Sequence, residues 1–247
     1  MARHRAFPVL RSLWWLAAAM CALLLGGCAT GPQANPSDPF EPFNRQMYGF
    51  NDAVDRAVLK PVAIAYRDAT PDMARTGVRN FFANLGDAWS FVNNVLQLKP
   101  QAASESFIRF NVNTLFGLGG LLDIASEMDI DRHKQDFGQT LARWGVPSGP
   151  YLVLPILGPS TVRDTAALPV DAQGDLLSQV HDIPVRNSIF VLRGVDTRAN
   201  LLRAGDVLDD AALDRYSFTR DVYLQLRKGG PKSASGGDGE VPEEDAK

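Results

Sequence analysis

Two apolar runs that glycine or proline interrupts limit what this chain can fold into. Residues 115–125 read LFGLGGLLDIA, and residues 151–157 read YLVLPIL. Both are shorter than the roughly 20 apolar residues that a helix needs to cross a bilayer. Glycine disfavours regular helix in the first run and proline does so in the second, where it costs about 3 kcal/mol. We therefore expect a glycine-bearing hairpin in the first run and an extended, irregular segment in the second.

The glycine run has two interpretations. Gly117, Gly119 and Gly120 permit a tight reversal that lets two apolar arms lie side by side. The hairpin is then either buried between helices or a functional hinge, and both readings stay open. A dinucleotide-binding loop is not expected, because Leu122 stands where a third glycine or alanine is needed and no strand precedes the run. We expect no cofactor.

The first 28 residues indicate export. Three arginines precede the apolar run SLWWLAAAMCALLL, and the junction Leu25-Gly26-Gly27-Cys28 follows it. This order is typical of a secretory signal rather than of a membrane span, and the junction matches the bacterial lipoprotein box. We expect removal of residues 1–27 and acylation of Cys28, which would tie the chain to a membrane through its lipid.

The residues around the acylated cysteine narrow the compartment. Cys21 lies in the signal, so the mature chain would have no second thiol for a disulfide or a thiolate metal site. Ala29 follows Cys28, where an Asp would favour retention in the inner membrane. We expect an outer-membrane lipoprotein.

Composition divides the remaining chain. We expect a lipidated tether over residues 28–37, one domain over residues 38–228, and a disordered tail over residues 229–247, which are rich in glycine, serine and acids. Without the signal, 22 basic residues face 28 acidic ones, a net charge of −6. No basic stripe stands out, so nucleic acid is not an expected partner.

Helical periodicity dominates the start of the domain and predicts a mainly α fold. One predicted helical face carries Phe43, Met47, Phe50, Val54 and Val58. This face is either core or a contact with lipid. Lys60-Pro61 is expected to end the helix, Thr70-Pro71 to start a second, and Gly86 to break that second helix.

The same reasoning extends to the C-terminal half. A helix is expected after Pro100, a short one near Phe137, and another from Pro184. Ser160 is expected to cap a short helix, and a last amphipathic helix should cover residues 209–226.

Catalytic signatures are missing from the sequence. After the signal the chain has two histidines, His133 and His181, and neither has the spacing of a metal-ligand or nucleophile motif. Asn111 and Asn113, before the glycine run, are read as caps or backbone partners. We expect neither an enzyme nor a metal centre.

The ordered motifs of the domain resemble the MlaA (VacJ) family of Gram-negative outer-membrane lipoproteins. The resemblance covers nearly all of residues 38–227 and is carried by DPFEPFNRQMYGFN, KPVAIAYRD, NFFANL, RFNVNTLFGLGGLLDIA, FGQTLARWGVPSGPYLVLPILGPSTVRD and TRANLL. It implies a mainly α-helical, ring-like protein seated in the inner leaflet of the outer membrane, with an amphipathic channel.

The resemblance also implies a function and partners. Members of this family associate with trimeric porins and remove phospholipid mislocalised to the outer leaflet. They pass it to a soluble periplasmic carrier for retrograde transport. A polar lane for the headgroup beside apolar surface for the acyl tails would lower the barrier without covalent chemistry.

The resemblance assigns roles to particular residues. Mobility of the glycine hairpin, through Gly117, Gly119 and Gly120, is implied to gate the passage of lipid. The segment Tyr48-Gly49-Phe50-Asn51 of the first helix is implied to regulate the channel, with Phe50 and Asn51 positioning that hairpin. Arg163 and Asp164 are read either as a polar lane or as a structural ion pair.

Two other functions remain open. A membrane-attached phospholipid hydrolase would need a nucleophile that depends on His133 or His181. A purely structural lipoprotein would only scaffold a porin.

Overall fold

The computed structural model describes residue 35 and residues 38–228, without the side chains of residues 207–211 and 228. The expected signal over residues 1–27, the acylated Cys28 and the tail over residues 229–247 lie outside the described residues. Most of the expected tether over residues 28–37 does so as well.

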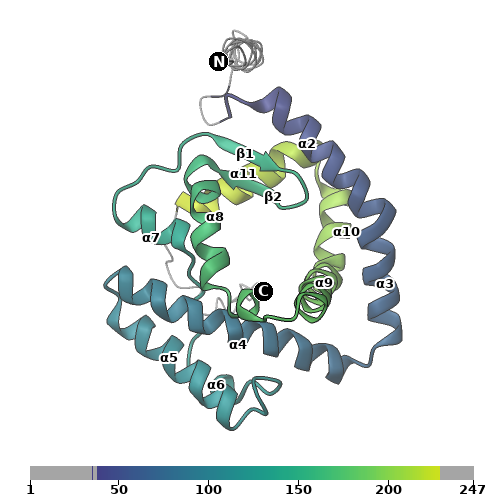
Figure 1. Ribbon diagram of the computed structural model, residues 1–247. Coiled ribbons are helices and arrows are strands. Elements are labelled where there is room, and N and C mark those ends of the chain that lie inside the picture. The colour runs from purple at the N-terminus through teal and green to yellow at the C-terminus, as the bar shows by residue number, and fades with distance from the viewer. Residues whose placement is uncertain (1–34, 36–37, 229–247) are drawn as a thin grey trace, which may run out of the picture.

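The described elements follow one another around a ring (Figure 1). The first half contains α2 (Glu41–Val54), η1 (Asp55–Leu59), α3 (Lys60–Ala69), α4 (Asp72–Leu96), α5 (Pro100–Leu115), α6 (Ile124–Glu127) and α7 (Phe137–Arg143). The second half contains β1 (Tyr151–Leu154), β2 (Gly158–Thr161), α8 (Val162–Gly174), η2 (Leu176–Gln179), α9 (Ile183–Asn200), α10 (Leu202–Ala211) and α11 (Arg215–Lys228). The prediction of a mainly α, ring-like fold is confirmed.

The first helix does not end at Lys60-Pro61. The chain continues from α2 through η1, a π-helical turn, directly into α3, where Pro61 occupies the first turn. A proline needs no backbone donor there, and the wider π turn admits its ring without breaking the rod. The prediction of a break was therefore wrong.

Helix α4 runs without interruption past Gly86 and packs along α5. A single glycine costs about 1 kcal/mol in a helix, and the contact with α5 outweighs that cost. The break predicted at Gly86 was wrong, whereas the starts predicted after Pro71 and Pro100 are confirmed.

Helices α4 and α5 bury mainly polar side chains. The buried residues of α4 are Asn84, Asp87, Ser90, Asn93 and Asn94, and those of α5 are Ala103, Ser106, Arg109 and Asn113. Large apolar side chains of the same helices, such as Val95 and Phe107, are exposed. The amphipathic pattern is present, but its polar face points inward.

The same inversion applies to α2. Phe43 and Phe50 are 39% and 47% exposed, and Asn44 between them is fully buried. The interpretation of this apolar face as core was therefore wrong for Phe43 and Phe50. Among the described residues, no helix combines the length and apolarity needed to cross a bilayer.

The proline-rich segment forms the antiparallel hairpin β1–β2. Tyr151 pairs with Thr161 and Leu154 pairs with Gly158. The expectation of an extended segment is confirmed, but the expectation that it is irregular was wrong, because the two strands pair in a continuous antiparallel register. Thr161, not Ser160, caps the next helix through a hydrogen bond from the Asp164 N–H, and that helix is long rather than short.

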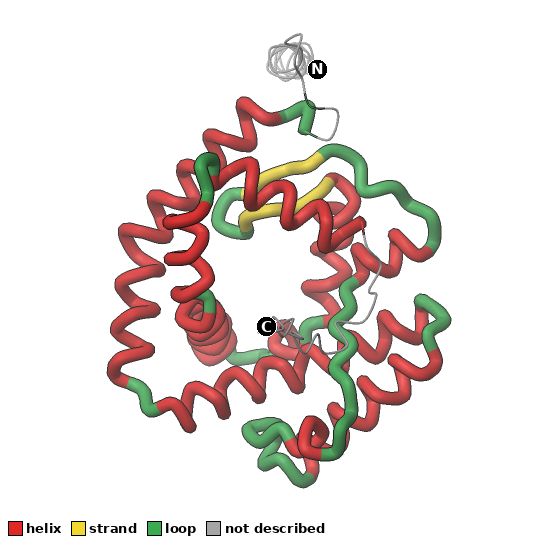
Figure 2. Tube along the Cα trace, turned by 180° about the vertical axis from the view of Figure 1, so that it is seen from behind, coloured by secondary structure: helices red, strands yellow, loops and turns green. Residues whose placement is uncertain are grey.

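The C-terminal region forms separate helices. Helix α9 begins at Ile183, as Pro184 predicted. The single helix expected over residues 209–226 is instead divided into α10 and α11 by residues 212–214. Figure 2 shows how this end of the chain returns toward α2 and the hairpin, which closes the ring.

A small aromatic core joins the hairpin to α11. Its buried members are Tyr151, Val153, Tyr216 and Leu224. Asn44 attaches α2 to this core: its amide donates to Asp38 Oδ1 (2.8 Å) and to the Tyr151 carbonyl (3.0 Å), and its oxygen accepts from the Val153 N–H (2.8 Å). One side chain thus satisfies buried backbone groups of β1.

Replacing Asn44 by Ala should therefore destabilise the fold. Two backbone groups of β1 would be left buried without partners, at about 2–4 kcal/mol in total, or roughly a 5–10 °C fall in Tm. Thermal unfolding in detergent, followed by circular dichroism, measures this. Asn111→Ala is the matched control, since the Asn111 amide bonds only the Phe107 carbonyl one turn back. Equal Tm values for the two variants would contradict the assignment.

Candidate functional site

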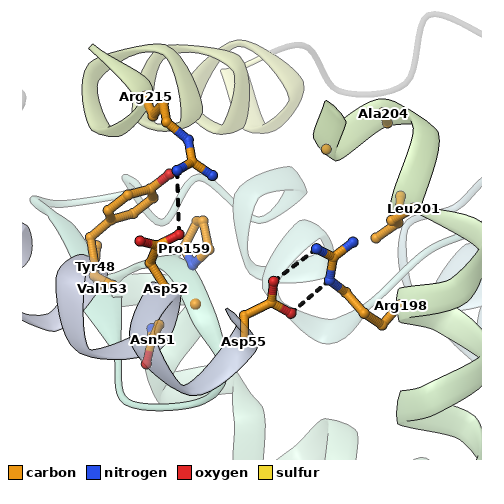
Figure 3. A pocket seen from close by; sticks show the side chains of 12 residues that line it. Tyr48, Asn51, Asp52, Asp55, Val153, Pro159, Arg198, Leu201, Ala204 and Arg215 are labelled. Atoms are coloured by element: carbon orange, nitrogen blue, oxygen red, sulfur yellow. Dashed lines mark hydrogen bonds and ion pairs between the residues drawn. The ribbon is translucent and has the colours of Figure 1, made fainter. Parts of the chain in front are cut away.

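A pocket of about 360 Å³ lies between the N-terminal helix, the hairpin and the C-terminal helices. Figure 3 shows its lining. The contributing residues are Tyr48, Asn51 and Asp52 of α2, Asp55 of η1, Val153, Gly158 and Pro159 of the hairpin, Arg198 of α9, Leu201, Ala204 and Gly205 around α10, and Arg215 of α11. Elements from both ends of the domain therefore meet here.

Two ion pairs cross this pocket. The Arg198 guanidinium binds both oxygens of Asp55, at 2.6 and 2.8 Å. Arg215 Nη1 lies 3.5 Å from Asp52 Oδ1. Both pairs connect the N-terminal elements α2 and η1 to C-terminal helices. A bidentate Arg–carboxylate contact fixes the geometry of the two partners as well as pairing their charges. They help to hold the ring closed.

The pocket lining is amphipathic. Charged groups of α2, η1, α9 and α11 face a wall formed in part by Val153, Pro159 and Leu201. Such a surface offers hydrogen bonds and charge on one side and apolar contact on the other. This surface suits an amphipathic ligand, which has one polar and one apolar end.

The four α2 residues singled out by sequence are placed differently. Tyr48 packs edge-on against Tyr216, with ring centroids 5.8 Å apart. Gly49 has open space where a side chain would stand, and Phe50 is exposed. The Asn51 amide donates to the Leu154 carbonyl (2.9 Å), and its oxygen accepts from the Ile156 N–H (2.7 Å).

Asn51 therefore positions the β1–β2 turn and not the glycine hairpin, which corrects the sequence-based expectation. The glycine hairpin lies on the far side of the ring, beyond α5 (Figure 1). The turn that Asn51 holds exposes the apolar side chains of Ile156 and Leu157. The resemblance implied the glycine hairpin as the partner of Asn51, and the hydrogen bonds of Asn51 go to the other apolar run instead.

The glycine hairpin is a tightly closed turn. The Gly120 N–H donates to the Asn113 carbonyl (2.9 Å), and the Leu122 N–H donates to the Gly117 carbonyl (2.9 Å). Gly119 and Gly120 have φ of +73° and +96°, a region that glycine adopts without strain. Leu115, Phe116 and Leu118 are each over 70% exposed. Of the two interpretations, burial between helices is wrong, and the role as a moving hinge stays a prediction.

A buried charge network anchors the base of this hairpin. Arg109, only 1% exposed, binds both oxygens of Asp123 at 2.7 and 2.9 Å and lies 3.5 Å from Asp87. Burial works against ionisation of Asp123, but hydrogen bonds from Ser126 and Asn113 and the arginine charges hold its pKa below the usual range. Burial raises the pKa of Asp87. Each charge of this anchor therefore lies beside an opposite one.

Arg163 and Asp164 form a buried ion pair. Arg163 Nε donates to Asp164 Oδ1 at 2.9 Å, and the Tyr223 hydroxyl donates to Asp164 Oδ2 at 2.9 Å. Burial and the negative charge of Asp164 raise the pKa of Tyr223 to about 12. The geometry shows the structural ion pair, and the role of Arg163 and Asp164 as a polar lane stays a prediction.

The two histidines lie apart from this pocket. His133 Nε2 contacts Glu105 Oε2, and His181 lies in the connection between η2 and α9. Neither lines the pocket. The geometry thus gives no support to the nucleophile that a hydrolase would need.

Sequence reasoning missed the charged lining of the pocket. Tyr48, Asp52 and Asp55 stand at helical spacings of four and three, a polar stripe on the face of α2 opposite Phe43 and Phe50. This stripe could have been found in the same window as the apolar face. Its partners Arg198 and Arg215 are too far along the chain for spacing to identify.

The fold and the site define a class: a ring-like, mainly α-helical protein with an amphipathic pocket at the closure of the ring. Comparison with known proteins narrows the class. The family model described as MlaA lipoprotein matches residues 36–229. The chain belongs to the MlaA lipoprotein family.

Named relatives agree with this membership. The chain is 38% identical over 215 residues to the intermembrane phospholipid transport system lipoprotein MlaA of Escherichia coli (strain K12), covering 85% of each chain. It is 36% identical over 219 residues to the protein of the same name from Haemophilus influenzae, covering 85% of this chain and 87% of the relative.

A solved structure has the same fold. It comes from work on the structural basis for maintenance of bacterial outer membrane lipid asymmetry. The TM-score is 0.69 at 38% identity, and the match covers 77% of this chain and 97% of that one.

The three hairpin glycines should differ in their tolerance of alanine. A Cβ at Gly120 would lie 2.7 Å from Asn84 Nδ2, whereas a Cβ at Gly119 meets open space. Both residues have positive φ, which costs alanine about 1–2 kcal/mol, so Gly120→Ala should add a clash to that cost. Gly117→Ala should also clash, at 2.3 Å from the Leu122 carbonyl.

Thermal or denaturant unfolding would rank these variants. Gly49→Ala is the control, because the added methyl group sits in open space on a helix and should stabilise by about 0.5–1 kcal/mol. Equal destabilisation by Gly119→Ala and Gly120→Ala would show that close packing is not what requires glycine at position 120.

Proposed function

We propose that this chain transports phospholipids and so maintains the lipid asymmetry of the outer membrane. As an outer-membrane-associated lipoprotein, it removes mislocalised phospholipids from the outer leaflet. The carrying observation is the amphipathic pocket at the ring closure, in a chain whose relatives are named for intermembrane phospholipid transport.

The physical argument concerns the headgroup. A charged group crosses hydrocarbon slowly, because its desolvation is costly. Charged side chains such as Asp52 and Arg215 would offer the headgroup polar contacts, while Pro159 and Leu201 stay beside the acyl chains. Transfer along such a path forms no covalent bond, so the proposed activity is transport and not catalysis.

The apolar exterior supports partial immersion in the membrane. Exposed side chains gather at the glycine hairpin, and Ile156 and Leu157 form a second apolar tip on the β1–β2 turn. Surfaces of this kind are aggregation-prone in water and stable in contact with lipid. In this proposal the ring lies at the periplasmic face of the outer membrane, next to a trimeric porin. A soluble periplasmic carrier receives the lipid from the ring.

Reconstitution tests the proposal against its alternatives. Vesicles that contain the chain and a porin are incubated with the soluble carrier, and lipid on the carrier is analysed by mass spectrometry. Transport delivers intact phospholipid, a hydrolase would deliver lysophospholipid or free fatty acid, and a scaffold would deliver nothing beyond the porin-only background.

A disulfide can test whether the glycine hairpin must move. A Cβ built on Gly77 of α4 lies 4.0 Å from Leu121 Cβ, within the roughly 3.5–4.5 Å that disulfides span. Gly77→Cys with Leu121→Cys should therefore lock the hairpin onto α4. If hairpin movement gates lipid, oxidised cells should accumulate outer-leaflet phospholipid, and a reductant should reverse this. Labelling of surface phospholipid measures it.

The single variants Gly77→Cys and Leu121→Cys are the matched controls, since each carries half of the change without the cross-link. Wild-type labelling in cells with complete disulfide formation would refute the gating role and leave the transport proposal standing. A disulfide is used to restrict the hairpin instead of a proline substitution, because proline cannot adopt the positive φ of Gly119 and Gly120.

Loosening the other turn gives an independent test of regulation by α2. Asn51→Ala would free the Leu154 carbonyl and the Ile156 N–H beside the pocket. We expect that lipid passage is regulated less tightly, because the variant loses two hydrogen bonds worth about 1 kcal/mol each. Outer-leaflet phospholipid should then rise about twofold or more. Asn111→Ala is the control, and unchanged labelling at equal protein levels would argue against the role of Asn51.

A further inference from the structure

A second cluster of chemically capable side chains lies outside the pocket, where α5 meets the connection from α6 to α7. Glu105 comes from α5, and Asp131 and His133 come from residues 128–136. One ligand atom from each lies within 4.8 Å of the other two. Nothing in the transport proposal uses these residues.

We infer that Glu105, Asp131 and His133 form a binding site for a divalent transition-metal ion, with Zn²⁺ as the best match. Nitrogen and oxygen ligands lie about 2.0–2.2 Å from Zn²⁺, so donors around one ion are roughly 3–4 Å apart. In the structure the three ligand atoms lie within 4.8 Å of one another, so the widest separation exceeds 4 Å by no more than about 0.8 Å. Asp131 is exposed, so its side chain can rotate to close that difference.

Two of the three ligands are already held in place. Gln101 Nε2 donates to Glu105 Oε1 at 2.9 Å, which leaves Oε2 in contact with His133 Nε2. The amide of buried Asn94 donates to the His133 carbonyl at 3.2 Å and so ties the loop backbone to α4. Hydrogen bonds that orient the ligand groups are what metal sites in proteins require around them.

The local charge favours a cation. Two carboxylates face the site, while Arg132, between Asp131 and His133 in sequence, points its guanidinium elsewhere. That group lies 3.2 Å from Asp87 and 3.4 Å from Asp123. Arg132 is thus bound to the anchor of the glycine hairpin and does not neutralise the site.

The ligand set decides the class of metal. One imidazole nitrogen and two carboxylate oxygens suit Zn²⁺ and similar ions, whereas Ca²⁺ takes six to eight oxygens and Mg²⁺ retains most of its waters. Three protein ligands leave a coordination position for water. A bound ion would connect α5 to the segment leading into α7, and so brace the region from which the glycine hairpin projects.

Titration of the metal-stripped full chain tests the inference. The protein, purified in detergent without a histidine tag, is titrated with ZnCl₂ by calorimetry, and Co²⁺ serves as a spectroscopic probe. We expect one Zn²⁺ per chain and a Co²⁺ absorption band typical of nitrogen and oxygen ligands. Saturating Zn²⁺ should raise Tm by about 5 °C or more.

Variants locate the site. His133→Ala and Glu105→Gln should each weaken Zn²⁺ binding about tenfold or more, with the Co²⁺ band lost or shifted. Glu105→Gln keeps the size of the side chain, so it remains informative if His133→Ala folds poorly. His181→Ala is the matched control and should bind like the wild type.

Three results would overturn the inference. They are an absence of Zn²⁺ binding by the wild-type chain, binding that survives both His133→Ala and Glu105→Gln, and binding that His181→Ala removes. Because the readouts are affinity and absorption, they are independent of phospholipid transport, and failure here leaves the proposed function untouched.

Discussion

The fold depends on an inverted arrangement in which polar and charged side chains are buried and apolar ones are exposed. Arg109, Gln97 and Asn44 are among the largest fully buried side chains. Burying such groups costs several kcal/mol unless each one finds partners. The partners here are the Tyr151 carbonyl, the Thr140 hydroxyl and the Asp123 carboxylate. The apolar exterior gains nothing from water. A medium less polar than water on the outside is the physical condition under which this arrangement is favourable.

Closure of the ring follows from the same constraint. Because the residues that the structure describes form no large apolar core, the ends of the domain are joined by specific polar contacts at the pocket. Asp55 with Arg198 and Asp52 with Arg215 connect the N-terminal rod to the C-terminal helices. Paired charges of this kind are directional, so they fix the width of the ring where an apolar seam could slide. The same four residues also line the pocket and give it its charged groups. The stability of the ring and the chemistry of the site therefore depend on the same side chains.

Sequence periodicity predicted most helices but not which face points inward. The spacing of Phe43, Met47 and Phe50 correctly predicted a helix at α2. It did not predict that Phe50 is exposed and Asn44 is buried. An amphipathic pattern defines two faces and says nothing about the solvent on either side. Long-range pairing was also beyond reach. Asn51 contacts residues more than 100 positions away, and no local rule distinguishes the β1–β2 turn from the glycine hairpin as its partner.

The two exposed apolar tips share one physical device. Each is a short turn with apolar side chains, and in each an asparagine side chain hydrogen-bonds to backbone groups of the turn. Asn51 does this for the turn at Ile156, and Asn80, whose amide donates to the Leu121 carbonyl at 3.2 Å, does so for the glycine hairpin. Unpaired backbone groups are what keep irregular turns out of hydrocarbon. A tip whose polar groups are bonded to the protein can leave water, and it does so without the length of a membrane-spanning helix.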